Sequence, residues 1–466
     1  MSENPEETGG TKEEASDKEE VAIDVAQENN AETPQEDAPE NSEEQPQSEV
    51  KPDIASESGE VAGDSENSTQ QKSAYVVADN VKDTSDVANP DQDVVDPGAN
   101  SEEAQKKVYT DTRLDELLGS YNSEFDESKP ETRCAISFEY YPPRTTESLK
   151  NLYEKMERMK TQKPLYCSVT WGAGGSTAKV SLDIAKVLKG KFEIVPNLHL
   201  TCTNMEKHII KETLDDCRLL KIKNVMALRG EEAKDSSEGE APEFSSAIDL
   251  IRYMRENYEE HEFCIQTAGY PEGHGTKINK IDNPKMLTEN EKKRIVHRPD
   301  ADYVCHEEEY QQEIDYLKEK VDAGANIIVT QFFFDVQVYI HFVEKCREAG
   351  IDVPIVPGIM IILAYGSFKR IQDFSRCRVP DDVAEKLESL KKDASGFREY
   401  GIELATNMCK ELIEYGVPGL HFYTLNMEKS VNEVLKNIGR FIGDNDKNKK
   451  GKEADVKEST TDATSN

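Results

Sequence analysis

The middle of the chain opens with the stretch Cys134-Ala135-Ile136-Ser137-Phe138-Glu139-Tyr140-Tyr141-Pro142-Pro143. It is the first of eight short apolar runs, each of which ends in polar or glycine-rich residues. The runs cover residues 134–143, 164–171, 193–202, 224–230, 262–271, 326–335, 353–360 and 419–426. Their length and their content of β-branched and aromatic residues are typical of buried strands.

Helical patterns separate most of these runs, with apolar residues recurring every three or four positions. The helical patterns cover residues 146–160, 177–188, 205–220, 244–258, 309–323, 336–349 and 398–415. Strands that alternate with helices predict a parallel sheet with crossover helices. Eight units favour a closed (β/α)8 TIM barrel, although an open doubly wound sheet has the same alternation.

In a barrel of this kind, functional side chains gather at the C-terminal ends of the strands. The residues at those ends are Glu139, Thr170-Trp171-Gly172, His199-Leu200-Thr201, Arg229-Gly230-Glu231, Tyr270-Pro271, Gln331, Pro357-Gly358 and Tyr423-Thr424-Leu425-Asn426. Polar, glycine and aromatic residues therefore share one rim, which indicates a ligand site there.

The two ends of the chain differ from its middle in composition. Residues 1–107 hold 30 acidic and 7 basic residues and a single aromatic residue, Tyr75. Such a segment buries too little apolar surface to offset its ordering entropy, so we expect an acidic, disordered extension. Residues 444–466 are predicted to be a disordered polar tail. The folded part, residues 108–443, is then one acidic domain, which argues against nucleic-acid binding.

Targeting signals and cysteine spacing indicate the compartment in which the protein is expected. No apolar run approaches the roughly 20 residues needed to cross a bilayer, and the acidic N-terminus is unlike a signal peptide. We therefore expect a soluble, cytoplasmic protein without a membrane partner. Its 9 cysteines show no CxxC or metal-ligand spacing. Buried reduced thiols are expected rather than disulfides, and no metal site is expected.

Glu139 is the first candidate catalytic residue, because its carboxyl follows Phe138 and precedes two tyrosines and two prolines. Rings that exclude water favour the protonated carboxyl, which suits a general acid. A structural ion pair is the alternative interpretation.

The segment 170–177 reads Thr-Trp-Gly-Ala-Gly-Gly-Ser-Thr and joins the second strand to a helix. Its glycines let backbone amides approach an anion at the helix N-terminus, although a tight strand-to-helix turn explains them equally well. His199 has two interpretations, a hydrogen-bonded core histidine or a ligand contact. His274 follows Tyr270-Pro271-Glu272-Gly273 in a constrained loop that presents polar groups at the rim. Gln331 offers an amide to a heterocycle.

Taken together, the strand-end motifs resemble the catalytic domain of methylenetetrahydrofolate reductases. The motifs are FEYYPPR from Phe138, VTWGA from Val169, HLTC from His199, ALRG from Ala227, AGYPEGH from Ala268, TQFFFD from Thr330, PIVPGI from Pro354 and HFYTLN from His421. They occur in the family's order from about residue 134 to residue 440. The resemblance implies an FAD-binding barrel that uses NADPH or NADH to reduce 5,10-methylenetetrahydrofolate to 5-methyltetrahydrofolate in one-carbon metabolism.

The resemblance also implies roles for individual residues. Glu139 would be the general acid that helps to open the five-membered ring of the folate before hydride arrives from reduced flavin. Gln331 would contact both the folate and the nicotinamide, which take turns over one flavin face in a ping-pong scheme, and Thr170 would face the nicotinamide. Glu231 would lie beside the flavin and the folate, where the family usually has aspartate. The implied FAD contacts are Thr170, Trp171, Ala173, His199, Arg229, Gly230, Glu231, Ala247, Tyr270, His274 and Lys320, with Arg229 and Lys320 on the phosphates.

Several positions depart from the family pattern. Glu231 is one methylene longer than the usual aspartate, Met427 replaces a frequent arginine, Glu313 stands where aspartate is frequent, and residues 359–363 lack a common proline. Residues 276–305 form an insertion that is either a surface excursion or a lid near the flavin. The chain ends soon after the eighth unit, so we expect no counterpart of the regulatory domain of many eukaryotic relatives.

Two other functions remain open beside the reductase. A catalytically impaired homologue that binds flavin or folate as a regulatory partner would explain Glu231 and Met427. Another flavin barrel oxidoreductase acting on a different cyclic amine is the third hypothesis. The sequence decides neither between NADPH and NADH nor whether the chain forms a homo-oligomer.

Overall fold

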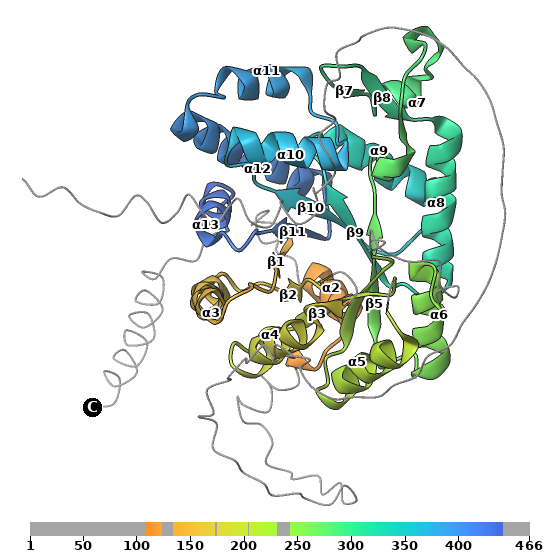
Figure 1. Cartoon of the computed structure of the whole chain (residues 1–466), viewed down its shortest axis with the longest axis vertical. Coiled ribbons are helices and arrows are strands. Elements are labelled where there is room, and N and C mark those ends of the chain that lie inside the picture. Colours follow the sequence, from red (N-terminus) through yellow and green to blue (C-terminus); the bar gives the residue numbers. More distant parts are fainter. Residues whose placement is uncertain (1–108, 124–133, 173–174, 204, 231–242, 441–466) are drawn as a thin grey trace, which may run out of the picture. The chain divides into compact units, whose positions relative to one another are not determined.

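The structure is a computed structural model that describes residues 109–123, 134–172, 175–203, 205–230 and 243–440. Eight parallel strands close into a barrel in the order β1-β11-β10-β9-β5-β4-β3-β2. The strands are β1 (Ala135–Tyr140), β2 (Tyr166–Val169), β3 (Pro196–Thr201), β4 (Asn224–Leu228), β5 (Cys264–Gly269), β9 (Ile327–Phe332), β10 (Ile355–Met360) and β11 (Gly419–Tyr423). Helices surround these strands in Figure 1.

All eight predicted strands are present, and the closing pair of β1 with β11 confirms the barrel over an open sheet. The predicted runs are longer than the strands because they include loop residues at one or both ends of each strand. β1, for example, ends at Tyr140, and the two prolines that follow shortly afterwards cannot donate ladder hydrogen bonds.

The seven predicted helices are also present, and the described residues contain five further helices that lie before, between or after the predicted elements. The predicted helices are α3 (Thr146–Met159), α4 (Ala178–Gly190), α5 (Lys207–Leu219), α6 (Ala247–Asn257), α8 (Glu307–Asp322), α9 (Val336–Glu348) and α12 (Ala394–Tyr415). The further helices are α2 (Leu114–Ser123), α7 (Glu289–Lys292), α10 (Tyr365–Ser375), α11 (Asp381–Ser389) and α13 (Glu428–Asn437), and a 3-10 turn, η3 (Lys160–Gln162), follows α3.

The barrel helices form where the sequence supplies a cap and one apolar face. In α3, the side chain of Thr145 accepts a hydrogen bond from the backbone N–H of Ser148. Leu152, Met156 and Met159 follow at helical spacing and are buried against the barrel.

Helix α2 packs at the N-terminal ends of the strands. Leu114 and Leu118 are fully buried there in one apolar cluster with Ala135 at the start of β1 and Ile327 at the start of β9. The backbone N–H of Leu114 also donates to the side-chain oxygen of Asn224, the first residue of β4, at 2.8 Å. Helix α2 therefore covers the end of the barrel that lies opposite the predicted site.

The insertion 276–305 folds into a small antiparallel sheet of order β6-β8-β7. Its elements are η5 (Gly275–Lys277), β6 (Ile278–Lys280), η6 (Pro284–Met286), α7, β7 (Val296–His297) and β8 (Asp302–Cys305). Arg294 is fully buried in it and donates to the backbone oxygen of Cys305 and to Glu307 Oε2, at 3.3 and 3.0 Å. The guanidinium also lies 3.7 Å from the ring centre of Tyr310 and 3.3 Å from His341 Nε2. The insertion is thus packed against α8 and α9.

The segment between β10 and α12 is held to the insertion and to the loop after β5. Arg378 donates to the backbone oxygen of Ile295 at 2.8 Å and pairs with Asp335 at 2.8 Å. Its backbone N–H donates to Glu272, a buried carboxyl in the loop after β5, at 3.3 Å. Three loops near the C-terminal ends of β5, β9 and β10 are therefore cross-linked by polar contacts.

The acidic extension (residues 1–107) and the polar tail (residues 444–466) predicted at the chain ends lie outside the described residues. Within the described part of the chain, no helix is both long and apolar enough to cross a membrane.

Candidate functional site

Glu139 lies near the end of β1, where two histidines face its carboxyl. Its Oε2 is 3.2 Å from His421 Nε2 and 3.5 Å from His199 Nε2. The other ring nitrogen of His421 lies 2.8 Å from Ser137 Oγ. Thr424 donates to the backbone oxygen of Glu139 at 2.6 Å. Residues from β1, β3 and β11 are thereby brought together at the mouth of the barrel.

The electrostatics of this group differ from the sequence prediction. Burial raises the pKa of Glu139, but His199 and then His421 act against it, so the pKa lies below its ordinary value. Burial lowers the pKa of His199, and the neighbouring carboxylate offsets this only in part. The expectation of a protonated glutamate is therefore wrong for the free protein, because two imidazoles face the carboxyl in addition to the aromatic rings.

A belt of buried polar residues lies below Glu139 inside the barrel. The ring of Tyr166 stacks on His421, with ring centres 5.8 Å apart. Asn197 donates to Ser168 and Gln266 at 2.9 and 2.8 Å. The Tyr166 hydroxyl lies close enough to Ser137 and Gln266 for both to act on its pKa as hydrogen-bond partners. This polar interior holds the His421 ring in place.

A second group of predicted residues gathers around Lys320 on α8. The Lys320 side chain is buried, and its ammonium donates to the backbone oxygen of Ala268 at 2.8 Å. It also lies 5.1 Å from the ring centre of Tyr316. Burial lowers the pKa of Lys320 to about 8, with Glu313 acting in the opposite direction.

His274 lies beside the same lysine. Burial lowers its pKa, as do the positive charges of Arg229, Lys320 and Lys277, while Glu313 raises it. The His274 ring meets Tyr270 edge-on, with centres 4.8 Å apart. The structure therefore brings four of the predicted cofactor residues together, and their summed charge favours an anion.

The start of α6 adds a helix N-terminus to the site. Ala247 is buried in the first turn, and Ser246 and Asp249 form a capping box before it. Gly230 follows β4 with a φ of +86°, and a Cβ there would lie 2.9 Å from Thr201. The close approach of two chain segments requires glycine at this position.

In the turn after β2, some backbone groups form hydrogen bonds with side chains of the turn and of the helix that follows. The Gly172 N–H donates to Thr177 Oγ1 at 2.8 Å, and the backbone oxygen of Thr170 accepts from Ser181. The Gly172 amide thus serves the tight turn rather than an anion. Trp171 is 8% exposed, and its buried indole N–H has no partner in the described part of the chain.

Gln331 lies on β9, on the part of the rim that carries an aromatic cluster. Its side-chain oxygen accepts from the backbone N–H of Phe332 at 3.0 Å. Phe332 meets Tyr423 of β11 edge-on, and Tyr423 donates to the backbone oxygen of Thr330. The Gln331 amide nitrogen is the part of this side chain that remains for a ligand.

Two predicted residues, Ala173 and Glu231, lie outside the described residues. Met427, where the family often has arginine, is half-buried and precedes α13. Its neighbour Asn426 exchanges two hydrogen bonds with the backbone of Tyr141 at 3.2 and 3.0 Å. The HFYTLN motif therefore fastens β11 to the end of β1.

Sequence reasoning missed the functional position of His421, Ser137 and Tyr166. His421 is in a quoted motif, but nothing in the local sequence shows that its ring reaches a residue 282 positions away. The strand periodicity could have indicated that Ser137 accompanies Glu139, because residues two positions apart lie on the same face of β1.

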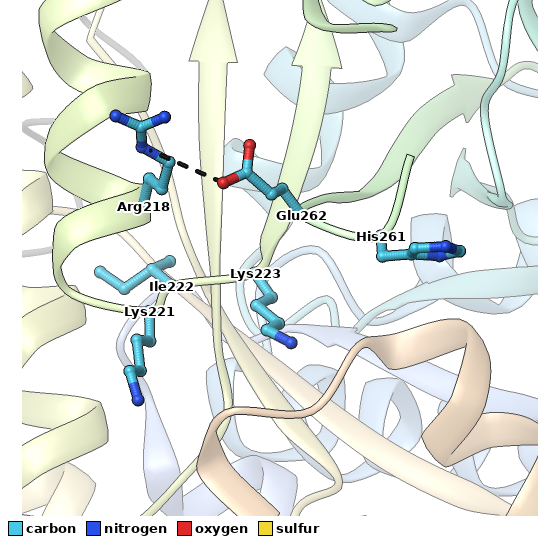
Figure 2. Close-up of a pocket in the computed structure, with 6 residues that line it drawn as sticks. All are labelled: Arg218, Lys221, Ile222, Lys223, His261 and Glu262. Carbon is cyan, nitrogen blue, oxygen red and sulfur yellow. Dashed lines mark ion pairs between the residues drawn. The ribbon is translucent and has the colours of Figure 1, made fainter. Parts of the chain in front are cut away.

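A separate pocket lies near the opposite end of the barrel, where β4 and β5 begin. Figure 2 shows its six lining residues, Arg218, Lys221, Ile222, Lys223, His261 and Glu262. Arg218 pairs with Glu262 at 4.0 Å, the two lysines point the other way, and His261 points away from the rest. These side chains do not converge on one point. Among the described residues, no three His, Cys, Asp or Glu side chains are grouped to hold a metal ion.

Comparisons with known proteins give the family of the chain. The family model described as methylenetetrahydrofolate reductase matches residues 124–439. A rice protein (Oryza sativa subsp. japonica) named probable methylenetetrahydrofolate reductase (NADH) is 40% identical over 67% of this chain and 49% of its own length. Methylenetetrahydrofolate reductase 1 of Schizosaccharomyces pombe is 40% identical over 66% of this chain and 46% of its own length. The 5,10-methylenetetrahydrofolate reductase of Escherichia coli is 32% identical over 65% of this chain and 90% of its own length. The chain thus spans about half the length of the first curated relatives that it matches.

Proposed function

The chain belongs to the methylenetetrahydrofolate reductase family, and we propose that it reduces 5,10-methylenetetrahydrofolate to 5-methyltetrahydrofolate with bound FAD and NAD(P)H as the hydride donor. The observation that carries this proposal is the Glu139 carboxyl, held between two histidines at the mouth of the barrel. A carboxyl in contact with imidazoles can take a proton from them and pass it to a substrate nitrogen.

The residues around Lys320 fit FAD. A dinucleotide needs cations or backbone N–H groups at its diphosphate and apolar surface at its ring system. Arg229 and Lys320 both place a positive charge close to His274, and the first turn of α6 lies on the same rim. The unpartnered indole N–H of Trp171 supplies a further donor. Bound FAD would supply hydride transfer from the nicotinamide to the folate.

The chain's own residues would orient the reactants and manage the proton. Gln331 would present its amide to the folate and to the nicotinamide in turn, which is a ping-pong scheme. Thr170 would face the nicotinamide. Glu231 would lie beside the folate, with a carboxylate one methylene longer than aspartate. Reaction rates depend on placement to within about 1 Å, so the reach of Glu231 matters for turnover.

The test uses the absorbance of the purified full chain. We expect a flavin spectrum that bleaches under anaerobic conditions with NADPH or NADH and recovers when methylenetetrahydrofolate is added. The rates with each donor decide the nicotinamide preference. A colourless protein that neither takes up FAD nor oxidises NAD(P)H would refute the proposal.

Glu139→Gln separates the two half-reactions. Because the amide cannot act as an acid, recovery with methylenetetrahydrofolate should slow by about 10²- to 10⁴-fold. Bleaching by NAD(P)H should stay within about twofold, since hydride transfer to the flavin does not need this proton. A flavoprotein whose wild-type form bleaches but never recovers would instead favour the impaired homologue, to which the replacement of arginine by Met427 points.

A further inference from the structure

We propose that the acid of this site is a three-residue assembly in which His421, oriented by Ser137, positions the Glu139 carboxyl and shares its proton. The catalytic part of this inference rests on the proposed function. The structural part concerns the protein without any ligand and is tested separately.

The strand register places the three residues in line. In the pairing of β1 with β11, Ser137 lies opposite His421, and Glu139 lies two residues further along β1. His421 Nδ1 is 2.8 Å from Ser137 Oγ, and its Nε2 is 3.2 Å from Glu139 Oε2. Both ring nitrogens are therefore occupied by residues of a single neighbouring strand.

The His421 ring has little freedom to turn. It is 1% exposed, and Tyr166 stacks on it with planes inclined by 12°. Tyr423 meets it edge-on at 5.2 Å and 87°. A ring held on two sides can be aimed at a carboxyl more accurately than a ring on a loop, which is what a positioning residue requires.

Proton counting shows why Ser137 matters. The Ser137 hydroxyl can donate to His421 Nδ1 at 2.8 Å or to the backbone oxygen of Leu420 at 3.4 Å, and the Tyr166 hydroxyl is a further hydrogen-bonding neighbour of Ser137. When Ser137 donates to Nδ1, the neutral ring carries its proton on Nε2 and donates to an ionised Glu139. When Ser137 donates to Leu420, Nδ1 must hold a proton, and the Nε2–Oε2 contact needs one more. The second state holds one proton more than the first.

The second state is the donating one. Reduction of the methylene bridge adds a hydride to carbon and one proton to nitrogen, so each turnover consumes one proton. The proton between Nε2 and Oε2 leaves through Glu139: its O–H bond breaks and an N–H bond forms on the folate nitrogen. His421 keeps the proton on Nδ1 and is left neutral, and a proton from water restores the assembly.

The titratable groups that face Glu139 come from three strands. They are His199 on β3, Tyr166 on β2, and His421 and Tyr423 on β11. Burial raises the pKa of Tyr166 to about 12 and raises that of Tyr423 well above its ordinary value. Both tyrosines therefore stay neutral near pH 7, so the proton that is exchanged lies among the glutamate and its two histidine neighbours.

The first test needs no substrate. We would record the ¹⁵N ring signals of the eight histidines of the labelled full chain against pH and assign His421 by their loss in His421→Gln. In wild-type protein we expect Nε2 to be protonated in the neutral ring. Ser137→Ala should change the tautomer balance and move the titration of this ring, whereas Ser137→Thr, which keeps the hydroxyl, should restore it. An unchanged His421 titration in Ser137→Ala would overturn the inference.

The second test follows the two half-reactions. We expect Ser137→Ala to slow flavin recovery with methylenetetrahydrofolate about tenfold and His421→Gln about a hundredfold, with a shifted pH profile. Bleaching by NAD(P)H should stay within about twofold. The matched control is His297→Gln, because His297 also lies 2.8 Å from a carboxylate, Asp302, but on the insertion. A pH profile unchanged in both site variants would contradict the assembly.

A failure of the proposed function and a failure of the three-residue assembly would give different results. If wild-type protein never recovers with methylenetetrahydrofolate, the proposed function fails, and the ring titration still decides whether Ser137 and His421 act on Glu139. If wild-type protein recovers but the ring titration is insensitive to Ser137, only the assembly is wrong.

Discussion

Two buried glutamates near the rim respond to their surroundings in opposite ways. Burial raises the pKa of Glu272 to about 8, with the Arg378 backbone N–H acting against it. Burial also acts to raise the pKa of Glu291, but hydrogen bonds from Thr288, His306 and Glu307 lower it to about 2. The number of hydrogen-bond donors that reach each carboxyl decides whether its pKa is raised or lowered.

Glu272→Gln should alter how stability depends on pH. The folded protein keeps a proton on Glu272 up to about pH 8, while the unfolded chain releases it above its ordinary value of 4.5. The stabilisation is complete below pH 4.5 and is lost as pH rises through about 8. Glutamine mimics the protonated carboxyl, so we expect little change near pH 5 and a gain on the order of a few kcal/mol above pH 8. Urea unfolding at both pH values measures the difference, and equal effects at both would contradict it.

Glu291→Gln should have the opposite pH dependence. This carboxylate accepts from the Thr288 N–H at 2.7 Å, the Glu307 N–H at 3.1 Å and the His306 ring at 2.9 Å. Its stabilisation is present above pH 4.5 and is lost as pH falls through about 2. We expect a loss of about 1–3 kcal/mol at pH 7 and a smaller loss at pH 3, measured by the same unfolding experiment. A variant as stable as the wild type at pH 7 would show that these hydrogen bonds contribute nothing.

At the residue scale, the sequence predicted positions better than contacts. Glu139 and His199 were placed at one rim and are within 3.5 Å of each other. The lowered pKa of Glu139 was not foreseen, because it depends on His199 and then on His421, whose rings reach Glu139 from β3 and β11 only when the barrel forms. The role of each predicted residue in binding FAD or folate stays a prediction.

At the scale of elements, α12 contains a glycine that the fold requires. A Cβ on Gly401 would overlap the backbone oxygen of Ile362, which follows β10. Gly401→Ala should therefore cost about 1–3 kcal/mol despite the better helix propensity of alanine. Gly119 in α2 is the matched control, because a Cβ added there would meet no atom within 4 Å, and Gly119→Ala should add about 0.5–1 kcal/mol. Thermal unfolding distinguishes the two, and a gain in both variants would contradict the close contact.

The elements that sequence reasoning predicted share one property, which is an apolar run or face long enough to show a period. β6, β7 and β8 have two to four residues each, too few for an alternating pattern. The insertion was expected to be either a surface excursion or a lid. Its buried Arg294 holds it against α8 and α9 through contacts between distant residues, which no local pattern reveals.

At the scale of the whole molecule, α2 supplies an apolar end cap to the barrel. Leu114→Ala removes a fully buried side chain from the cluster at that end and should cost about 2–5 kcal/mol. Leu219→Ala is the control, since Leu219 is 76% exposed, and it should stay within about 0.5 kcal/mol. Chemical denaturation measures both, and similar values would show that α2 adds little to the fold.

The closed end at α2 also bears on the order in which reactants meet. With one end covered by a helix, a small molecule would reach Glu139 and its two histidines only from the C-terminal end of the strands. Two reactants that need this site would then share one entrance, so the first would have to leave before the second could bind. Alternate binding of the hydride donor and the acceptor would in this way follow from the closed end of the barrel, without any difference in their affinities.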